Sequence, residues 1–350
     1  MKALVLEAYR KLVFTDVPRP ELREEKEVLI RVKAAAICGS DVHGIDGSTG
    51  RRKPPLIMGH EASGVIEAVG REVAGYQVGD RVTFDSTEYC GACFHCRREE
   101  INLCDNRRVL GVSCDEYRRD GAFAEYIVVP ERILYKIPDG LGFIDAALAE
   151  PVAVAAHAAA ITPLGLNESI AVVGAGLIGL LLLQILRPSC SGLIVALDVE
   201  PRRLEAARGF GADVTLNASE AGAVEQMRRL TAGRGIDRAF EAVGYAAPIG
   251  AAISCLRKGG SLTLIGNASP RIDFPLQTVV TRELAIFGSC ASAGEYEVAL
   301  DLMARKKINA AALVSAVAPL ADGALWFERL YNREPGLLKV VLEPLTPPGV

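Results

Sequence analysis

A glycine-rich turn between an apolar run and a helical segment constrains the fold of this chain most strongly. The turn reads Gly174-Ala-Gly176-Leu-Ile-Gly179 and closes the apolar run SIAVVGAG. The first glycine permits a tight turn, the second lets a ligand approach the backbone, and the third lets the helix pack closely on the strand. From about Pro151 onward, apolar runs of strand length alternate with helical segments, and we expect Gly259-Gly260 to form the turn before the strand SLTLIG. This alternation predicts a doubly wound parallel sheet.

The same turn predicts a dinucleotide site. A pyrophosphate can bind the free amides at the N-terminus of the following helix, where the helix dipole favours negative charge. Asp198 lies 19 residues beyond Gly179, at the end of the apolar run LIVAL, where a carboxylate can accept hydrogen bonds from an adenosine ribose. Its negative charge favours NAD over NADP, although Arg202 and Arg203 lie close enough to accommodate a 2′-phosphate.

The remainder of the chain has a different pattern. Residues 1–150 form short β-rich runs separated by Gly, Pro and Asp, which predicts a compact all-β region. From about Ala291 to Val350 the pattern is less regular. The longest apolar run, Ile170 to Leu186, approaches the length of a membrane span. Its three early glycines and Gln184 instead favour a buried strand, turn and helix, so we expect no membrane partner.

Charge and cysteine content exclude further classes of protein. The chain has 39 Lys+Arg, 43 Asp+Glu and a formal net charge of −4, which provides no positive field to hold a nucleic acid. The N-terminal run MKALVLEAYRKLVF is interrupted by Glu7 and leads to no small-residue cleavage site, so we expect a cytoplasmic protein. Nine cysteines in such a chain argue against a disulfide framework and for metal binding or thiol chemistry.

Four of the cysteines lie close together in YCGACFHCRREEINLC. Thiolates at such spacing can enclose one tetrahedral ion, and four sulfurs without an open position are typical of a structural zinc site. Disulfides are one alternative, which the expected compartment disfavours. An iron–sulfur cluster is another, but the last gap is seven residues rather than three and no proline follows. We expect His95 to face solvent. The predicted ligands are Cys90, Cys93, Cys96 and Cys104.

A second candidate metal site combines Cys38, in CGSDVH, with His60 and Glu61, in GHE. Each part alone is uninformative, because a lone cysteine often fills a core and a His-Glu pair often lies in a polar turn. Together they offer a thiolate, an imidazole and a carboxylate, a donor set suited to zinc with one open position.

These motifs, in this order, resemble those of the zinc-dependent medium-chain alcohol and polyol dehydrogenases over the full length of the chain. The motifs that carry the resemblance are CGSDVH, GHE, the four-cysteine segment, EPVAVAAHA and GAGLIG. The resemblance implies a GroES-like catalytic domain formed by residues 1–151 and 291–350, with a structural zinc lobe at about 88–106. It places a Rossmann NAD-binding domain between them, at residues 152–290, and implies a homodimer or homotetramer.

The resemblance also implies roles for individual residues. Cys38, His60 and Glu61 match the ligands of the catalytic zinc. Glu150 matches a glutamate that ligates the metal or reaches it through water, and its alternative role is that of a helix N-terminal carboxylate beside Pro151. Ser40 and His43 match a proton relay that passes through the nicotinamide ribose. The further cofactor contacts implied by the resemblance are Leu177, Ile178, Arg203, Ile265, Gly266 and Cys290.

The chain departs from the family members that act on sorbitol. Those proteins have an aromatic residue after the relay histidine and an Arg-Tyr pair in the returning segment, where this chain has Gly44 and Ala291-Ser292. The four-cysteine spacing and the sequence around Glu150 resemble galactitol-1-phosphate dehydrogenases, which implies a phosphorylated polyol. The run from Arg51 to Lys53 offers charge for a phosphate or carboxylate, but such runs are more often solvated surface.

The sequence therefore predicts a zinc-dependent NAD(H) oxidoreductase that interconverts a secondary alcohol of a polyol, polyol phosphate or cyclitol and its ketone. A threonine-type or simple-alcohol dehydrogenase of the same fold is one alternative. A catalytically silent dinucleotide-binding protein is the other, but it has no chemical need for the cysteine, serine, histidines and glutamate described above. The remaining cysteines, Cys114, Cys190 and Cys255, are expected to be small buried residues, and His157 to be structural.

Overall fold

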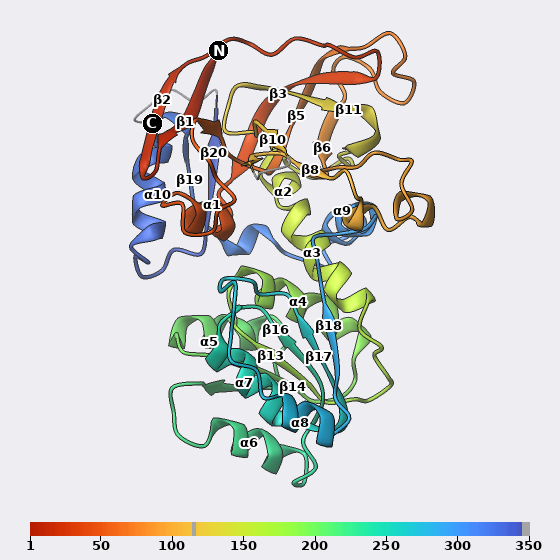
Figure 1. Cartoon of the computed structure of the whole chain (residues 1–350), viewed down its shortest axis with the longest axis vertical. Coiled ribbons are helices and arrows are strands. Elements are labelled where there is room, and N and C mark those ends of the chain that lie inside the picture. Colours follow the sequence, from red (N-terminus) through yellow and green to blue (C-terminus); the bar gives the residue numbers. More distant parts are fainter. Residues whose placement is uncertain (114–116, 345–350) are drawn as a thin grey trace. The chain divides into compact units, whose positions relative to one another are not determined.

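The computed structural model describes residues 1–113 and 117–344, so Cys114 lies outside the described residues. The chain forms two compact units. One unit joins Met1–Glu150 to Ala293–Val350, and the other is Pro151–Ser292. Figure 1 labels many of the helices and strands of both. The first unit is thus built from two segments that are far apart in the sequence.

The first unit is built around a seven-stranded sheet. Its longest strand is β3 (Glu27–Ala36), a run rich in Val, Ile and Ala in which residues of both faces are buried. β3 pairs antiparallel with β5 (Glu61–Val69), β11 (Tyr126–Pro130) and β20 (Lys339–Glu343). The sheet is completed by β6 (Arg81–Phe84), β12 (Leu134–Lys136) and β19 (Val314–Pro319). A smaller sheet contains β1 (Lys2–Ala8), β2 (Lys11–Asp16) and β4 (Leu56–Ile57).

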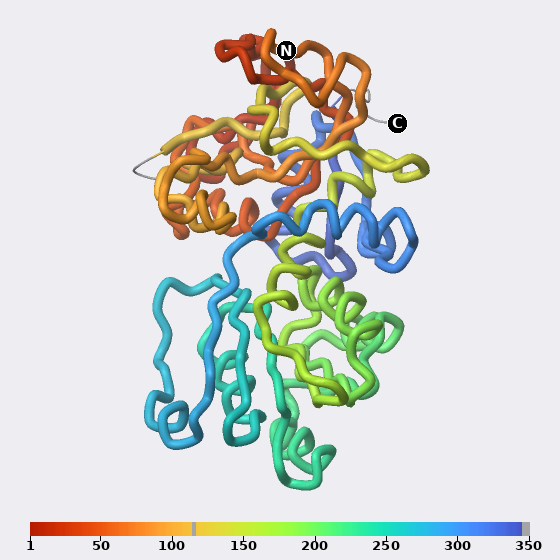
Figure 2. The backbone as a smooth tube through the Cα atoms, turned by 90° about the vertical axis from the view of Figure 1, so that its right-hand side faces the viewer, coloured from red at the N-terminus to blue at the C-terminus, as the bar shows by residue number. Residues whose placement is uncertain are grey.

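The C-terminal segment is more regular than its sequence pattern predicts. It contains α9 (Tyr296–Ala304), β19, α10 (Gly323–Tyr331) and β20. β20 lies between β3 and β19, and its Val341 pairs with Ala36 of β3. Figure 2 shows the C-terminal chain in blue beside the red and orange N-terminal strands of the same unit. The local pattern does not indicate this regularity, because β20 pairs with a strand about 300 residues earlier in the sequence.

Strand pairing in this unit brings distant motifs together. Ala36, the last residue of β3, pairs with Glu61, the first residue of β5. The short helix α1 (Gly39–Gly44) follows β3 directly, and Cys38 caps its N-terminus by accepting a hydrogen bond from the Ser40 amide at 3.5 Å. The segment CGSDVH therefore lies beside the segment GHE. Two further helices follow in the chain, α2 (Phe143–Ala147) and α3 (Ala149–Ala160).

The second unit contains the predicted parallel sheet, which confirms the doubly wound fold. Its strand order is β15-β14-β13-β16-β17-β18, and every adjacent pair is parallel. The order reverses at β13, from which the chain builds the sheet first in one direction and then in the other. The strands are β13 (Ile170–Val173), β14 (Ile194–Asp198), β15 (Val214–Asn217), β16 (Ile236–Glu241), β17 (Leu256–Leu264) and β18 (Ala285–Gly288). The helices are α4 (Leu177–Ser189), α5 (Pro201–Gly209), α6 (Ala223–Leu230), α7 (Ala246–Cys255) and α8 (Leu276–Thr281).

Two local predictions in this unit have different outcomes. The pair Gly259-Gly260, predicted to be a turn before a strand, lies inside β17, where the pairing with β16 shifts register. The positive φ of Gly259, 67°, fits this irregularity better than a separate turn. The apolar run from Ile170 to Leu186 divides into β13 and α4 as predicted. Among the described residues, every helix is too short or too polar to cross a membrane.

Candidate catalytic and metal-binding sites

Three of the predicted metal ligands meet in the first unit. Cys38, His60 and Glu61 each offer one ligand atom, and these atoms all lie within 4.8 Å of one another. His60 and Glu61 are 6% and 1% exposed, whereas Cys38 is only partly buried. The cluster is therefore closed on its histidine and glutamate side and more open on its cysteine side.

The carboxylate of Glu61 is poorly satisfied for a buried group. The Lys339 ammonium forms a close ion pair with it and also donates a hydrogen bond to the Ile37 carbonyl at 3.0 Å. Neither carboxylate oxygen nevertheless accepts a hydrogen bond of normal geometry. Burial acts to lower the pKa of Lys339, but the negative charge of Glu61 outweighs it and the pKa is raised. A buried carboxylate with free lone pairs beside a thiol and an imidazole fits a divalent zinc ion.

His60 also lies close to a second buried carboxylate. Its Nδ1 lies 3.4 Å from Oδ1 of Asp41, a fully buried residue in the first turn of α1. Burial opposes ionisation of Asp41, but the charges of His60 and Arg52 outweigh it and lower the pKa of the carboxyl. A carboxylate on one ring nitrogen is the usual arrangement for a histidine that ligates a metal through the other.

The two predicted relay residues lie on α1. Ser40 and His43 are both exposed, and a spacing of three residues places them on one face of the helix. The Ser40 hydroxyl donates a hydrogen bond to the Cys38 sulfur at 3.3 Å. Ser40 therefore lies directly beside the cluster.

Glu150 lies apart from this cluster. It is partly buried in the first turn of α3, and its carboxylate is not among the ligand atoms gathered within 4.8 Å. Burial, together with the negative charge of Glu61, raises the pKa of Glu150 to about 8. The structure thus places Glu150 near enough to Glu61 for their charges to interact, in the helix N-terminal position that the sequence offered as its alternative role.

One prediction about charge in this region was wrong. The run from Arg51 to Lys53 was expected to be solvated surface, and Arg51 and Lys53 are indeed exposed. Arg52 is instead only 3% exposed and forms an ion pair with Asp41 at 2.8 Å. The buried carboxylate requires a cation, and Arg52 is close enough to supply it.

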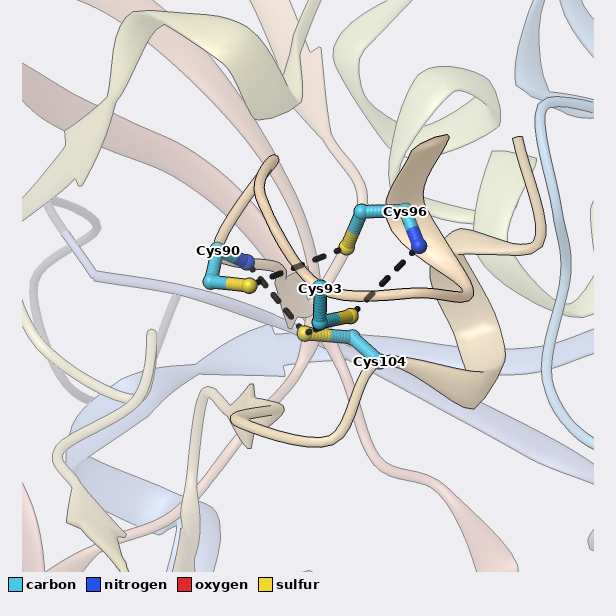
Figure 3. A group of neighbouring side chains, drawn as sticks. All are labelled: Cys90, Cys93, Cys96 and Cys104. Atoms are coloured by element: carbon cyan, nitrogen blue, oxygen red, sulfur yellow. Dashed lines mark hydrogen bonds between the residues drawn. The ribbon is translucent and has the colours of Figure 1, made fainter. Parts of the chain in front are cut away.

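The four lobe cysteines converge as predicted (Figure 3). Their sulfurs lie within 4.8 Å of one another, with 3.9 Å between Cys90 and Cys96 and between Cys93 and Cys104. A disulfide needs about 2 Å, whereas a tetrahedral zinc ion with Zn–S bonds of about 2.3 Å holds its sulfurs about 3.8 Å apart. All four are free cysteines. The separation therefore fits a tetrahedral ion and excludes disulfide bonds among these four residues.

Backbone and side-chain donors surround these sulfurs. The Ala92 amide and the Asn106 side chain donate hydrogen bonds to the Cys90 sulfur, which lowers the pKa of that thiol to about 6. Donors directed at sulfur favour the thiolate, which is the form that binds a metal. His95 is half-buried rather than turned to solvent, and its Nδ1 lies 2.9 Å from Glu100 Oε2. The short strands β7 (Thr87–Glu88) and β8 (Arg108–Val109) flank this lobe.

The glycine-rich turn of the second unit has the geometry expected of a phosphate-binding loop. Gly174 has φ +97°, and a Cβ there would lie 2.4 Å from a Val243 methyl. A Cβ on Gly179 would lie 1.9 Å from the Gly174 carbonyl oxygen. Gly176, the N-cap of α4, instead faces open space. Gly174 and Gly179 are thus required by the turn itself, and Gly176 leaves room for a ligand at the helix N-terminus.

Asp198 lies at the end of β14, beside this turn. Its carboxylate accepts hydrogen bonds from the amides of Ala175 at 2.7 Å and Glu200 at 2.9 Å. Arg203 lies 3.9 Å from the same carboxylate and is partly exposed. The other predicted cofactor contacts lie in the same unit. Leu177 and Ile178 begin α4, Ile265 and Gly266 follow β17, and the exposed Cys290 follows β18.

Sequence reasoning missed the roles of Lys339 and Arg52 beside the catalytic cluster. Lys339 has a signal in the sequence, because it is a lone lysine next to the apolar run VVL. In the structure it is 1% exposed. Arg52 carries none, since its two neighbours have the same charge and are exposed. The predictions for Cys190 and Cys255, two small buried residues, are confirmed at 6% and 0% exposed.

Comparisons with known proteins agree with this geometry. The family model of the alcohol dehydrogenase GroES-like domain matches residues 24–139, and that of zinc-binding dehydrogenases matches residues 178–305. The sorbitol dehydrogenase of Bacillus subtilis (strain 168) is 35% identical over 349 residues, which cover 98% of this chain and 97% of that protein.

Solved structures are similar over the same extent. Galactitol-1-phosphate dehydrogenase from Escherichia coli has a TM-score of 0.90 at 28% identity, covering 98% of this chain and 100% of that chain. A chain from Sinorhizobium meliloti 1021, bound to NADP, has a TM-score of 0.89 at 28% identity, covering 98% and 99%. The protein described here therefore belongs to the zinc-binding medium-chain alcohol dehydrogenases, which are oxidoreductases that act on CH–OH groups.

Proposed function

We propose that this protein oxidises a secondary alcohol of a polyol, polyol phosphate or cyclitol to its ketone, with a catalytic zinc ion and NAD. The observation that carries the proposal is the cluster of Cys38, His60 and Glu61, in which a buried carboxylate has oxygens without hydrogen-bond partners. Zinc and a nicotinamide dinucleotide are the cofactors of such a dehydrogenase. When bound, the zinc would act as a Lewis acid that makes the substrate hydroxyl more acidic, and the nicotinamide would accept the hydride.

The side chains of the site have three proposed roles: metal binding, orientation of a ligand and proton transfer. Cys38, His60 and Glu61 would hold the metal, and Asp41, whose Oδ1 lies 3.4 Å from His60 Nδ1, would orient the ring. The Ser40 hydroxyl accepts the proton of the substrate alcohol as it gives up its own. His43, one helical turn further on the same exposed face, releases the proton to solvent, a role that an exposed imidazole can fill. Glu150 would ligate the metal or reach it through water.

Two of the similar proteins support the substrate class. They are named as dehydrogenases of sorbitol and of galactitol 1-phosphate. Gly44 and the Ala291-Ser292 pair remove side chains that the members acting on sorbitol use. We therefore favour a polyol other than sorbitol, with a simple alcohol or threonine as the alternative substrates.

We further propose a second, structural zinc ion bound by the four lobe cysteines at residues 88–106. NAD is favoured over NADP because the buried carboxylate of Asp198 lies where the adenosine ribose is held in such folds. Two observations favour NADP instead: Arg203 lies near Asp198, and the similar chain from Sinorhizobium meliloti is bound to NADP. We assign the catalytic domain to residues 1–151 and 291–350, and the NAD-binding domain to residues 152–290.

A homodimer or homotetramer in the cytoplasm completes the proposal. Strand β18 is an edge of its sheet, and Leu276 and Val280, on the preceding helix α8, are about two-thirds exposed. An unpaired edge beside exposed apolar side chains is suited to pairing with a second copy. The eight free cysteines among the described residues are consistent with a reducing compartment.

A substrate screen tests the proposed function. The purified full chain, loaded with zinc, is mixed with NAD or NADP and with polyols, polyol phosphates, cyclitols, sugar acids, simple alcohols or threonine. We expect reduced cofactor to form with a polyol-like substrate and faster with NAD. Metal analysis should find about two zinc ions per chain. A zinc-loaded protein that oxidises none of these alcohols, with either cofactor, would refute the proposal.

A further inference from the structure

Arg52 is a buried cation that contacts the proposed relay. Its side chain is 3% exposed, although Arg51 and Lys53 on either side are exposed. The guanidinium donates to Asp41 Oδ1 through Nε at 3.2 Å and through Nη2 at 2.8 Å. Nη2 also donates to the Ser40 hydroxyl oxygen at 3.3 Å, and Nη1 to the Arg51 carbonyl at 3.1 Å. One guanidinium thus holds both the relay serine and the carboxylate behind His60.

Gly44 provides the space that this arrangement needs. A Cβ at position 44 would lie 2.5 Å from Cγ of Arg52 and 3.5 Å from Oγ1 of Thr49. Gly44 is not among the glycines with positive φ, so its backbone does not require glycine. Position 44 must lack a side chain because the aliphatic stem of Arg52 fills the space that a Cβ would need. An aromatic residue, which the members acting on sorbitol have here, is incompatible with this position of Arg52.

The chemistry of a guanidinium limits what Arg52 can do. It has five N–H donors and no acceptor, so it cannot take part in the relay as a proton carrier. By donating to the Ser40 oxygen it occupies one lone pair and directs the hydroxyl proton away from itself. That proton points to the Cys38 sulfur, 3.3 Å away, on the side where the metal ligands meet. Arg52 therefore fixes the position of the Ser40 oxygen and leaves it one lone pair with which to accept a proton.

We propose that Arg52 is a positioning residue for alcohol oxidation, which orients the Ser40 hydroxyl and Asp41 together, and that Gly44 makes room for it. The inference rests on the proposed role of Ser40 in proton transfer. It also changes the interpretation of the basic run from Arg51 to Lys53. Arg52 contacts Ser40 and Asp41, whereas Arg51 and Lys53 are exposed at the surface.

Matched variants of neighbouring arginines test the proposal. Arg52→Gln removes the buried cation, and Arg51→Gln removes the same charge from an exposed side chain. In the zinc-loaded enzyme we expect Arg52→Gln to lower kcat by about 10- to 100-fold, the range typical of groups that orient a catalytic residue. KM and the zinc content should change little, and Arg52→Lys should recover part of kcat. Arg51→Gln should match the unaltered enzyme.

A double-mutant cycle tests the role of Gly44. Gly44→Ala alone should displace the Arg52 stem and lower kcat as Arg52→Gln does, although both side-chain charges remain. In an Arg52→Ala background, which lacks the clashing Cγ, the same Gly44→Ala change should have little further effect. Additive effects of Gly44→Ala and Arg52→Ala would overturn the proposed link between the two positions.

Crystal structures decide the proposal independently of activity. In zinc-loaded Arg52→Gln and Gly44→Ala, we expect the Ser40 hydroxyl to leave its position beside Cys38, whereas in Arg51→Gln it should remain. A Ser40 hydroxyl that keeps its place in all three variants would overturn the proposal. So would a loss of zinc in Arg52→Gln with an unchanged kcat per bound zinc, because that result indicates a purely structural role. Failure of the proposed function is recognised separately, by an unaltered enzyme that oxidises no alcohol.

Discussion

Four buried charged side chains lie in or beside the cluster of Cys38, His60 and Glu61. Asp41 and Glu61 are 0% and 1% exposed, and each has one buried cation as its neighbour, Arg52 and Lys339 respectively. A buried charge without a partner is strongly destabilising, so each pair must persist together. Both oxygens of Glu61 are free of hydrogen bonds, whereas Asp41 has one such oxygen, Oδ2, and Glu61 is also a proposed metal ligand. Glu61 is therefore the proposed metal ligand of the two carboxylates, and Asp41 is the one proposed to orient His60.

Replacing Cys38 tests the catalytic metal site. Cys38→Ser should lower turnover by more than about 100-fold, since a direct ligand should count for more than the groups that orient it. It should also reduce the zinc content from two ions per chain to one while NAD still binds. The control is Cys190→Ala, at a buried cysteine of the second unit. Full activity of Cys38→Ser would contradict a catalytic zinc at this position.

Replacing Asp198 tests the preference for NAD. Asp198→Ala removes a carboxylate proposed to bind the ribose hydroxyls, and a hydrogen bond to a charged group contributes about 1.5–3 kcal/mol. The ratio of kcat/KM for NAD to that for NADP should therefore fall by about tenfold or more. Glu200→Ala, which removes an exposed carboxylate two residues away, is the control. An unchanged ratio in Asp198→Ala would count against the ribose assignment.

At the scale of elements, strand pairing determines which motifs meet. Antiparallel pairing of β3 with β5 places the CGSDVH and GHE motifs side by side, and β20 adds Lys339 from the far end of the sequence. In the second unit, the parallel strands β13 and β14 both end at the edge where the glycine-rich turn and Asp198 lie. The four-cysteine lobe differs from both, because it has only short 3₁₀ turns, Cys96–Arg98 and Ile101–Leu103, and no long strand.

The lobe should depend on its metal for order. Its residues are mostly exposed and have little apolar core, so we expect Cys104→Ser to release one zinc ion per chain. The segment from residue 88 to 106 should then become sensitive to limited proteolysis. The control is His95→Gln, which removes a surface contact with Glu100 of a kind that adds little to stability. Retention of both zinc ions by Cys104→Ser would argue against a four-sulfur site.

At the scale of the whole molecule, the hydrogen bonds and ion pair of one buried carboxylate link elements that are distant in the sequence. Asp237 of β16 accepts hydrogen bonds from the Ser169 amide at 2.8 Å and from Arg257 Nε at 2.5 Å. Burial opposes ionisation, but the hydrogen bond from Arg257 and those from Ser169 outweigh it and lower the pKa of Asp237 to about 2. Through these contacts β16 is tied to the segment that leads into β13 and to β17.

Acid should weaken the second unit through this carboxylate. The folded pKa of Asp237, about 2, lies below its ordinary value of 3.8, so ionised Asp237 stabilises the fold above pH 4 by about 2 kcal/mol. This contribution is lost as the pH falls from about 4 to about 2, and about half remains at pH 3. The free energy of unfolding of Asp237→Asn should therefore be lower than that of the unaltered protein at pH 7 and approach it at pH 3. The control is Asp273→Asn, an exposed residue. A constant difference from pH 7 to pH 3 would show that Asp237 does not have a lowered pKa.

Particular elements show how far the sequence could predict this fold. The run SIAVVGAG, the glycine spacing and the alternation that follows predicted β13, α4 and β14, because each of these patterns reports a local conformational requirement. β20 was not predicted as a regular strand, since its five residues become one only by pairing with β3 and β19. The internal position of Gly259-Gly260 in β17 was missed for the same reason, because the irregular pairing with β16 is a property of two strands.

The sequence by itself determined the chemistry that is available: two sets of metal-ligand residues, a glycine-rich turn and a carboxylate after the next strand. These are local patterns, and their spacing limits what they can bind. Only the tertiary structure decided which charges are buried beside them. Arg52 and Arg51 are indistinguishable in the sequence, yet one lies in the space left by Gly44 and the other in solvent. Burial and ion pairing depend on what packs against a residue from elsewhere in the chain, and that information is not present in the residue's own neighbourhood of the sequence.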